Sequence, residues 1–119
     1  MLFRSAQPLQ LPPADSAVVA TQKRLGPGVK VVSGFQNVSA ELLADLGATV
    51  ECDVLVCGDD PDAREEVVKL ARAAGMTAWH AGPLANSVAA EALTSVLIFI
   101  NRRYKSTHAG LKITGIDSA

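Results

Sequence analysis

The feature that most constrains the fold is an apolar run that ends in a strong helix-start signal. Residues 53–57 are, after Asp53, apolar without alternation, as expected of a strand buried on both faces of a parallel sheet. Gly58-Asp59-Asp60-Pro61 follows directly; Asp60 is suited to cap a helix, and Pro61 to fill its first position. The segment therefore predicts a buried strand followed by a helix, the repeating unit of α/β layer folds.

The rest of the chain continues this alternation of short strands and helices. It predicts helices over residues 16–25, 39–46, 61–74 and 86–103, strands over 30–35 and 77–80, a tight turn over 82–84, and a final strand or extended tail over 111–116. We expect an α/β fold with a partial parallel sheet, right-handed crossovers, flanking helices and a long, buried C-terminal helix. Because three strands leave open edges, the chain has the pattern of part of a larger fold.

Composition narrows the class of protein. The chain has 119 residues, 49% of them apolar and 19% charged, with a formal net charge of −1. This balance predicts one globular domain at most, with no general attraction to nucleic acid or an acidic membrane. The most apolar stretch, residues 88–100, contains Glu91 and is shorter than the ~20 residues of a membrane span, so a buried helix is favoured.

The two cysteines indicate a reducing compartment. Cys52 and Cys57 lie five positions apart in the expected strand, on opposite faces and roughly 16 Å apart. A disulfide requires less than about 7 Å between Cα atoms. We expect reduced core cysteines and a cytoplasmic protein.

The first 15 residues are expected to be an irregular N-terminal segment. Three prolines fall within residues 7–13, and no apolar run indicates a secretory signal. Leu2-Phe3-Arg4-Ser5 is what the tail of a common sequencing-library adapter would encode. This suggests a truncated reading frame in which Met1 is not the biological start.

No arrangement typical of a metal site or of acid–base catalysis stands out. Gly26-Pro27-Gly28 lacks the third glycine of a dinucleotide fingerprint and runs into a strand, so phosphate binding is disfavoured. Asp59-Asp60 is better explained by helix capping than by a metal or an acid–base pair. His80 is better explained as a strand-end residue than as a catalyst, and neither it nor His108 has a partner with metal-ligand spacing.

Three loops after the expected strands are candidate ligand contacts, at residues 34–38, 58–60 and 82–86. Ligands of open parallel sheets bind at the carboxyl ends of the strands. Glycines there permit close backbone approach, and Asn and Gln side chains offer donors and acceptors. An equally good alternative is that these residues simply make turns.

The sequence resembles a known family at several spaced motifs. These are Val31-Val32-Ser33-Gly34-Phe35-Gln36-Asn37-Val38, Cys52-Asp53-Val54-Leu55-Val56-Cys57-Gly58-Asp59-Asp60, Ala81-Gly82-Pro83-Leu84-Ala85-Asn86-Ser87, Glu91-Ala92-Leu93-Thr94 and Asn101-Arg102-Arg103-Tyr104-Lys105. In order and spacing they are similar to the NADPH-dependent reductases of coenzyme F420, over residues 16–116. The resemblance implies an oxidoreductase that passes hydride between NADP(H) and the deazaflavin F420. It also implies that residues 16–119 form the C-terminal, deazaflavin-binding part of a Rossmann-type enzyme, without the N-terminal half that binds NADP.

The resemblance also implies a set of site residues. Phe35, Val38, Pro83 and Leu84 would form apolar walls, Gln36, Asn37, Asn86 and Thr94 polar tethers, and Gly34 and Gly82 close-approach positions. Arg102, Arg103 and Lys105 would attract the anionic F420 tail, or else are ordinary charges at a helix C-terminus. Some family members carry His where this chain has Gln36, which cannot titrate, so acid–base catalysis is not expected there.

Two alternatives to the F420 reductase assignment stay open. Related domains use a flavin with NADPH to reduce ferric iron, and the sequence separates these from deazaflavin enzymes only weakly. The chain could instead be a non-catalytic module whose apolar helix over residues 86–100 builds a dimer. Whether the chain belongs to a deazaflavin or a flavin enzyme, we expect small-molecule cofactors as substrates, a homodimer, and no nucleic-acid or membrane partner.

Overall fold

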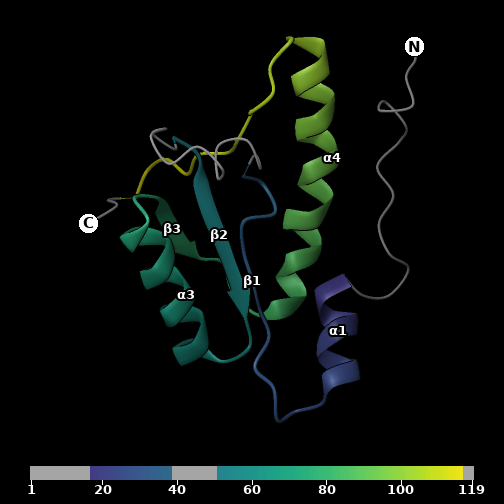
Figure 1. The fold of residues 1–119 in the computed structure, drawn as a ribbon, viewed down its shortest axis with the longest axis vertical. Helices are drawn as coiled ribbons and strands as arrows, with labels where there is room; N and C mark the ends of the chain where they lie inside the picture. The colour runs from purple at the N-terminus through teal and green to yellow at the C-terminus, as the bar shows by residue number, and fades with distance from the viewer. Residues whose placement is uncertain (1–16, 39–50, 117–119) are drawn as a thin grey trace.

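The described residues form a small mixed α/β layer structure (Figure 1). A computed structural model describes residues 17–38 and 51–116. Their elements are α1 (Ala17–Leu25), β1 (Val32–Ser33), β2 (Asp53–Gly58), α3 (Pro61–Ala73), β3 (Thr77–His80), the 3₁₀ helix η2 (Leu84–Asn86) and α4 (Ser87–Arg103). The sheet has the order β1-β2-β3, with α3 on one side and α1 and α4 on the other.

The predicted strand–helix unit is confirmed at β2 and α3. The Asp60 carboxylate accepts a hydrogen bond from the Ala63 backbone N–H at 2.8 Å, and Pro61 is the first helical residue. Gly75 follows the helix at φ 88°, and its N–H donates to the Arg72 carbonyl at 2.9 Å. Capping thus explains Asp60 without a metal or an acid–base role.

The direction of β1 differs from the parallel arrangement expected for all strands. β2 and β3 are parallel, but β1 is antiparallel to β2, with Val32 opposite Gly58 and Ser33 opposite Cys57. Gly34 therefore lies over the side chains of Val54 and Val56, and the chain after β1 runs back along β2. The loop over residues 34–38 therefore lies toward the end of the sheet where β2 and β3 begin, and not at the end where these two strands finish.

The hydrophobic core lies between the sheet and α3. Val54 and Val56 of β2, Val68 and Ala71 of α3, and Ala78 of β3 are each 0–1% exposed. Cys52 and Cys57 are both buried and free, which confirms that they are reduced core residues. The strand with no polar alternation is therefore buried on both faces, as predicted.

The long C-terminal helix is only partly buried, so the expectation of a buried helix holds for one face alone. Ser87, Ala90 and Leu97 of α4 are buried, whereas Val96 and Phe99 are more than 40% exposed. With η2, the helix spans Leu84–Arg103 and is long and apolar enough to cross a membrane by length and composition. The argument from length against a span is therefore wrong, although core helices of soluble proteins also meet these criteria.

The remaining expectations have mixed outcomes. The expected helix over residues 39–46, the N-terminal segment, and Ser16, which would cap the first expected helix, lie outside the described residues. The expected turn at 82–84 continues into η2, and β1 is shorter than the strand expected over 30–35. Residues 111–116 are an extended tail and not a strand.

Candidate functional site

Four of the sequence-predicted site residues line one pocket between the turn after β1, α4 and the C-terminal tail. The pocket has a volume of about 120 Å³. Its lining combines Gln36, Asn37, Val38, Thr94, Leu97, Ile98, Asn101, Thr107 and Ala109. The Thr94 hydroxyl donates to the Gln36 carbonyl oxygen at 3.1 Å, which ties α4 to the turn 58 residues earlier in the chain. We call this the Gln36–Thr94 pocket.

Phe35 holds the turn that enters this pocket in an unusual conformation. Its φ is 67°, in the left-handed region that non-glycine residues rarely adopt. The Val38 N–H donates to the Phe35 carbonyl at 3.2 Å, and the Phe35 ring packs against the core beneath. Strained backbone of this kind is concentrated at ligand sites, so this geometry favours a binding role for the turn.

The second predicted group, residues 82–86, lies at the other end of α4. Gly82 has φ 101°, and a Cβ there would overlap the Asn86 side-chain amide. That amide donates to the Ala81 carbonyl at 2.8 Å, while Leu84 is 1% exposed and Pro83 is exposed. In this chain, Leu84 is therefore a core residue, and Asn86 is engaged in holding its own turn.

Arg64 is a bracing residue for this turn that sequence reasoning missed. Its Nη1 donates to the carbonyls of Gly58 at 2.8 Å and Gly82 at 3.1 Å. Its Nε donates to His80 Nδ1 at 3.1 Å, so Nδ1 acts as an acceptor and the ring proton of a neutral His80 lies on Nε2. Nε2 is 2.6 Å from Glu65 Oε2 and can donate to it. In the sequence, Arg64 looked like any other charged residue on the polar face of α3, because the groups that it binds belong to other segments of the chain.

Asp59 braces the same turn from the other side. Its Oδ1 accepts a hydrogen bond from the Leu84 N–H at 3.0 Å, and the Gly58 N–H donates to the Gly82 carbonyl at 3.0 Å. Within residues 17–38 and 51–116, no group of three or more His, Cys, Asp or Glu side chains is arranged to hold a metal ion. Asp59 and Asp60 thus have separate structural tasks.

We predict that Arg64→Lys loosens the turn over residues 82–86 without unfolding the chain. Lysine keeps the charge, but its single ammonium cannot reproduce the arrangement in which Nη1 binds two carbonyls while Nε binds His80. Amide hydrogen exchange at Gly58 and Leu84 should accelerate about tenfold. Arg72→Lys is the matched control, because Arg72 lies on the same helix as Arg64 but donates to the Ala78 carbonyl in β3. Unchanged exchange at Gly58 and Leu84 in Arg64→Lys would show that Arg64 does not brace the turn.

The predicted basic residues lie near the Gln36–Thr94 pocket and away from the 82–86 turn. Arg102 and Arg103 end α4, and they follow Asn101, which lines the pocket. The start and end of this 17-residue helix are about 25 Å apart at 1.5 Å per residue. Lys105 has φ 55°, and Thr107, two residues later, also lines the pocket. The predicted site residues thus divide into two groups along α4.

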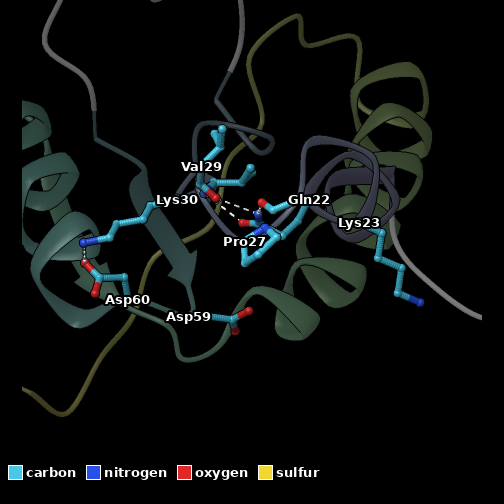
Figure 2. Close-up of a pocket in the computed structure, with 9 residues that line it drawn as sticks. Gln22, Lys23, Pro27, Val29, Lys30, Asp59 and Asp60 are labelled. Atoms are coloured by element: carbon cyan, nitrogen blue, oxygen red, sulfur yellow. Dashed lines mark hydrogen bonds and ion pairs between the residues drawn. The ribbon is translucent and has the colours of Figure 1, made fainter.

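A larger pocket lies between α1 and the end of β2 (Figure 2); the candidate loop over residues 58–60 forms part of it, whereas the contribution of α1 was not predicted. Its volume is about 530 Å³, and its lining includes Lys23, Lys30, Asp59 and Asp60. The Gln22 side chain donates to the Gly26 and Val29 carbonyls at 2.9 and 2.6 Å, and accepts from the Val31 N–H at 2.9 Å. Figure 2 shows Lys30 paired with Asp60, at 3.7 Å. The side chains of Gln22, Lys30 and Asp60 therefore bind other groups of the lining, and the Gly26-Pro27-Gly28 loop is braced as a turn.

Comparisons with known proteins identify relatives of this chain. No family model matches the chain. It is 41% identical over 106 residues to the F420-dependent NADP reductase of Methanocaldococcus jannaschii, covering 88% of this chain and 48% of the relative. It is 37% identical over 90 residues to the F420-dependent NADP reductase of Methanothermobacter thermautotrophicus, covering 75% of this chain and 39% of the relative.

A solved structure supports the same relationship. A proposed F420-dependent NADP reductase from Arthrobacter sp. FB24 aligns with a TM-score of 0.79 and 27% identity, over 92% of this chain and 51% of that one. The resemblance found in the sequence is therefore confirmed, and the α/β fold with it. The chain spans about half the length of the curated relatives it matches, or less.

Proposed function

We propose that this chain is the F420-binding part of an oxidoreductase that transfers hydride between NADP(H) and coenzyme F420. The observation that carries the proposal is that Gln36, Asn37, Val38 and Thr94, selected from the sequence, line one pocket in a relative of F420-dependent NADP reductases. NADP would bind to a Rossmann-type half that this chain does not contain, because it has no complete glycine-rich fingerprint.

The chemistry of the pocket suits hydride transfer between two rings. When bound, F420 supplies the ring carbon that gains or loses the hydride, so the protein needs to orient the rings and exclude water. Val38 and Leu97 are buried apolar residues of the lining, and Asn37 is a 6% exposed amide beside Thr94. These side chains can hold and orient a ring without moving a proton.

The size of the pocket bears on how much of the ligand it holds. Pockets that enclose a drug-sized ligand have volumes of about 300–1,000 Å³. At about 120 Å³, the Gln36–Thr94 pocket would take one edge of the deazaflavin ring. We propose that the NADP-binding half covers the rest of the ring. Arg102, Arg103 and Lys105, beside the pocket, would then attract the anionic tail.

The test is a titration of the chain with oxidised F420, followed by the change in F420 fluorescence, with FMN as the control. We expect saturable binding of F420 and weaker binding of FMN. Equal or tighter binding of FMN would instead favour the flavin-dependent reductase alternative. Folded protein that binds neither ligand would contradict a site formed by this chain alone.

We also propose that the protein is cytoplasmic and self-associates through α4. Its free cysteines are typical of a reducing compartment. On α4, Val96 and Phe99 are three residues apart, so they share one face of the helix, and they are 41% and 44% exposed. Apolar side chains on one exposed helix face favour burial against a second copy.

We predict that Phe99→Glu weakens this association at least about tenfold, because a carboxylate would have to be desolvated in the contact. Sedimentation equilibrium measures the change. Leu70→Glu is the control, since Leu70 is 67% exposed on α3, across the sheet from α4. A wild-type chain that stays monomeric at high concentration would contradict self-association.

A further inference from the structure

We infer that Asp53 is a positioning residue, which fastens residues 107–113 against the sheet as one wall of the Gln36–Thr94 pocket. The consequence for ligand binding rests on the proposed function. The fastening itself does not, and it can be measured without any ligand. Residues 107–113 are called the tail wall below.

Asp53 joins the tail wall to the sheet by main-chain and side-chain bonds. It is the first residue of β2 and is 3% exposed. Its N–H donates to the Leu111 carbonyl at 2.7 Å, and its Oδ2 accepts from the Ile113 N–H at 2.8 Å. The same Oδ2 accepts from Trp79 Nε1 at 2.8 Å, which fixes the carboxylate against β3. The buried carboxylate thus accepts one hydrogen bond from the tail wall and one from the sheet.

Two further contacts hold the tail wall. The Asn101 side-chain oxygen accepts from the Ala109 N–H at 2.8 Å, which ties the wall to the end of α4. Gly110 lies so close to Cys52 that a Cβ at position 110 would overlap the Cys52 Cβ. Glycine is therefore required at position 110 for the backbone to approach the sheet this closely.

The docked tail wall completes the pocket. Thr107 and Ala109 line the pocket together with residues of α4 and of the turn over 36–38. If the wall lifted away, both residues would leave the lining, and the pocket would open on that side. The apparent affinity for the ligand should therefore fall in proportion to the fraction of molecules with the wall docked.

Cys52 provides a ligand-independent measure of docking. It is 8% exposed, and burial raises the pKa of its thiol. The thiolate is the form that reacts with alkylating reagents, so a covered Cys52 should react slowly and an uncovered one quickly. Cys57, in β2, is 1% exposed and serves as an internal control within each molecule.

The experiment compares Ile113→Pro with Thr114→Pro. Proline at 113 removes the N–H that Asp53 accepts and leaves the buried sheet unchanged, so the chain should still fold. Thr114→Pro makes the same backbone change one residue later. Iodoacetamide alkylation of Cys52 and Cys57 is followed by mass spectrometry, and F420 affinity is measured by titration. We expect about tenfold faster alkylation of Cys52 in Ile113→Pro alone, and F420 affinity lowered by the factor by which the docked fraction falls.

Other outcomes would separately test the fastening by Asp53, its positioning role in ligand binding, and the proposed function. Equal alkylation of Cys52 in both variants would overturn the fastening by Asp53. The rate of Cys52 alkylation, relative to the rate in the urea-unfolded chain, gives the undocked fraction; an F420 affinity that falls less than the docked fraction does would overturn the positioning role. If the wild-type chain bound no F420 while Cys52 behaved as expected, the fastening would be supported and the proposed function of this chain contradicted.

Discussion

Leu84→Ala is expected to lower the free energy of unfolding by about 2–5 kcal/mol, because it leaves a cavity in a well-packed interior. Leu84 is 1% exposed and is among the largest of the fully buried side chains in the described residues. It begins η2, between β3 and α4, so its packing fixes where α4 starts. Urea denaturation, with the wild-type chain alongside, measures the effect.

Leu70→Ala removes the same atoms from α3, where Leu70 is 67% exposed. It should change the unfolding free energy by no more than about 0.5 kcal/mol. If the two variants were equally stable, Leu84 would not be a core residue in solution. It could then be the wall of a ligand site that the sequence suggested.

Thr94→Phe is expected to weaken F420 binding by at least about 100-fold, or about 3 kcal/mol. A phenyl group at this position fills much of a pocket of about 120 Å³. It also removes the hydroxyl that donates to the Gln36 carbonyl. Fluorescence titration of the purified variant measures the loss, with circular dichroism to verify folding.

Ser95→Phe is the matched control for this substitution. It introduces the same ring at the next position of the helix, where the side chain is exposed and does not line the pocket. F420 affinity should change less than about threefold, as for a surface substitution. Equal losses in both variants would place the ligand on the outer face of α4 and contradict the assignment to this pocket.

Signals that act within a few residues made most of the helices and two strands, β2 and β3, predictable. Asp60 and Pro61 specify the start of α3, and the unbroken apolar run specifies β2. The direction of β1 was not predictable in this way. It depends on pairing between residues such as Ser33 and Cys57, 24 positions apart in the sequence. The extended tail likewise depends on Asp53, 60 residues before Ile113.

The candidate site was predictable in part, for the same reason. Gln36 and Thr94 were selected by resemblance, and a hydrogen bond between two elements joins them. Leu84 and Asn86 were selected with them, although packing and the Ala81 carbonyl account for both. Arg64 and Asn101 gave no local signal, because the carbonyl and N–H groups that they bind come from other segments.

The most direct test of the account is to locate bound F420 by NMR on the isotope-labelled chain. The account predicts that F420 shifts the amide resonances of Gln36, Asn37, Val38 and Thr94, while those of Gln22 and Lys30 in the larger pocket stay unchanged. Shifts confined to Gln22, Lys30 and their neighbours would contradict the assignment of the site. So would a spectrum of folded protein that F420 leaves unchanged.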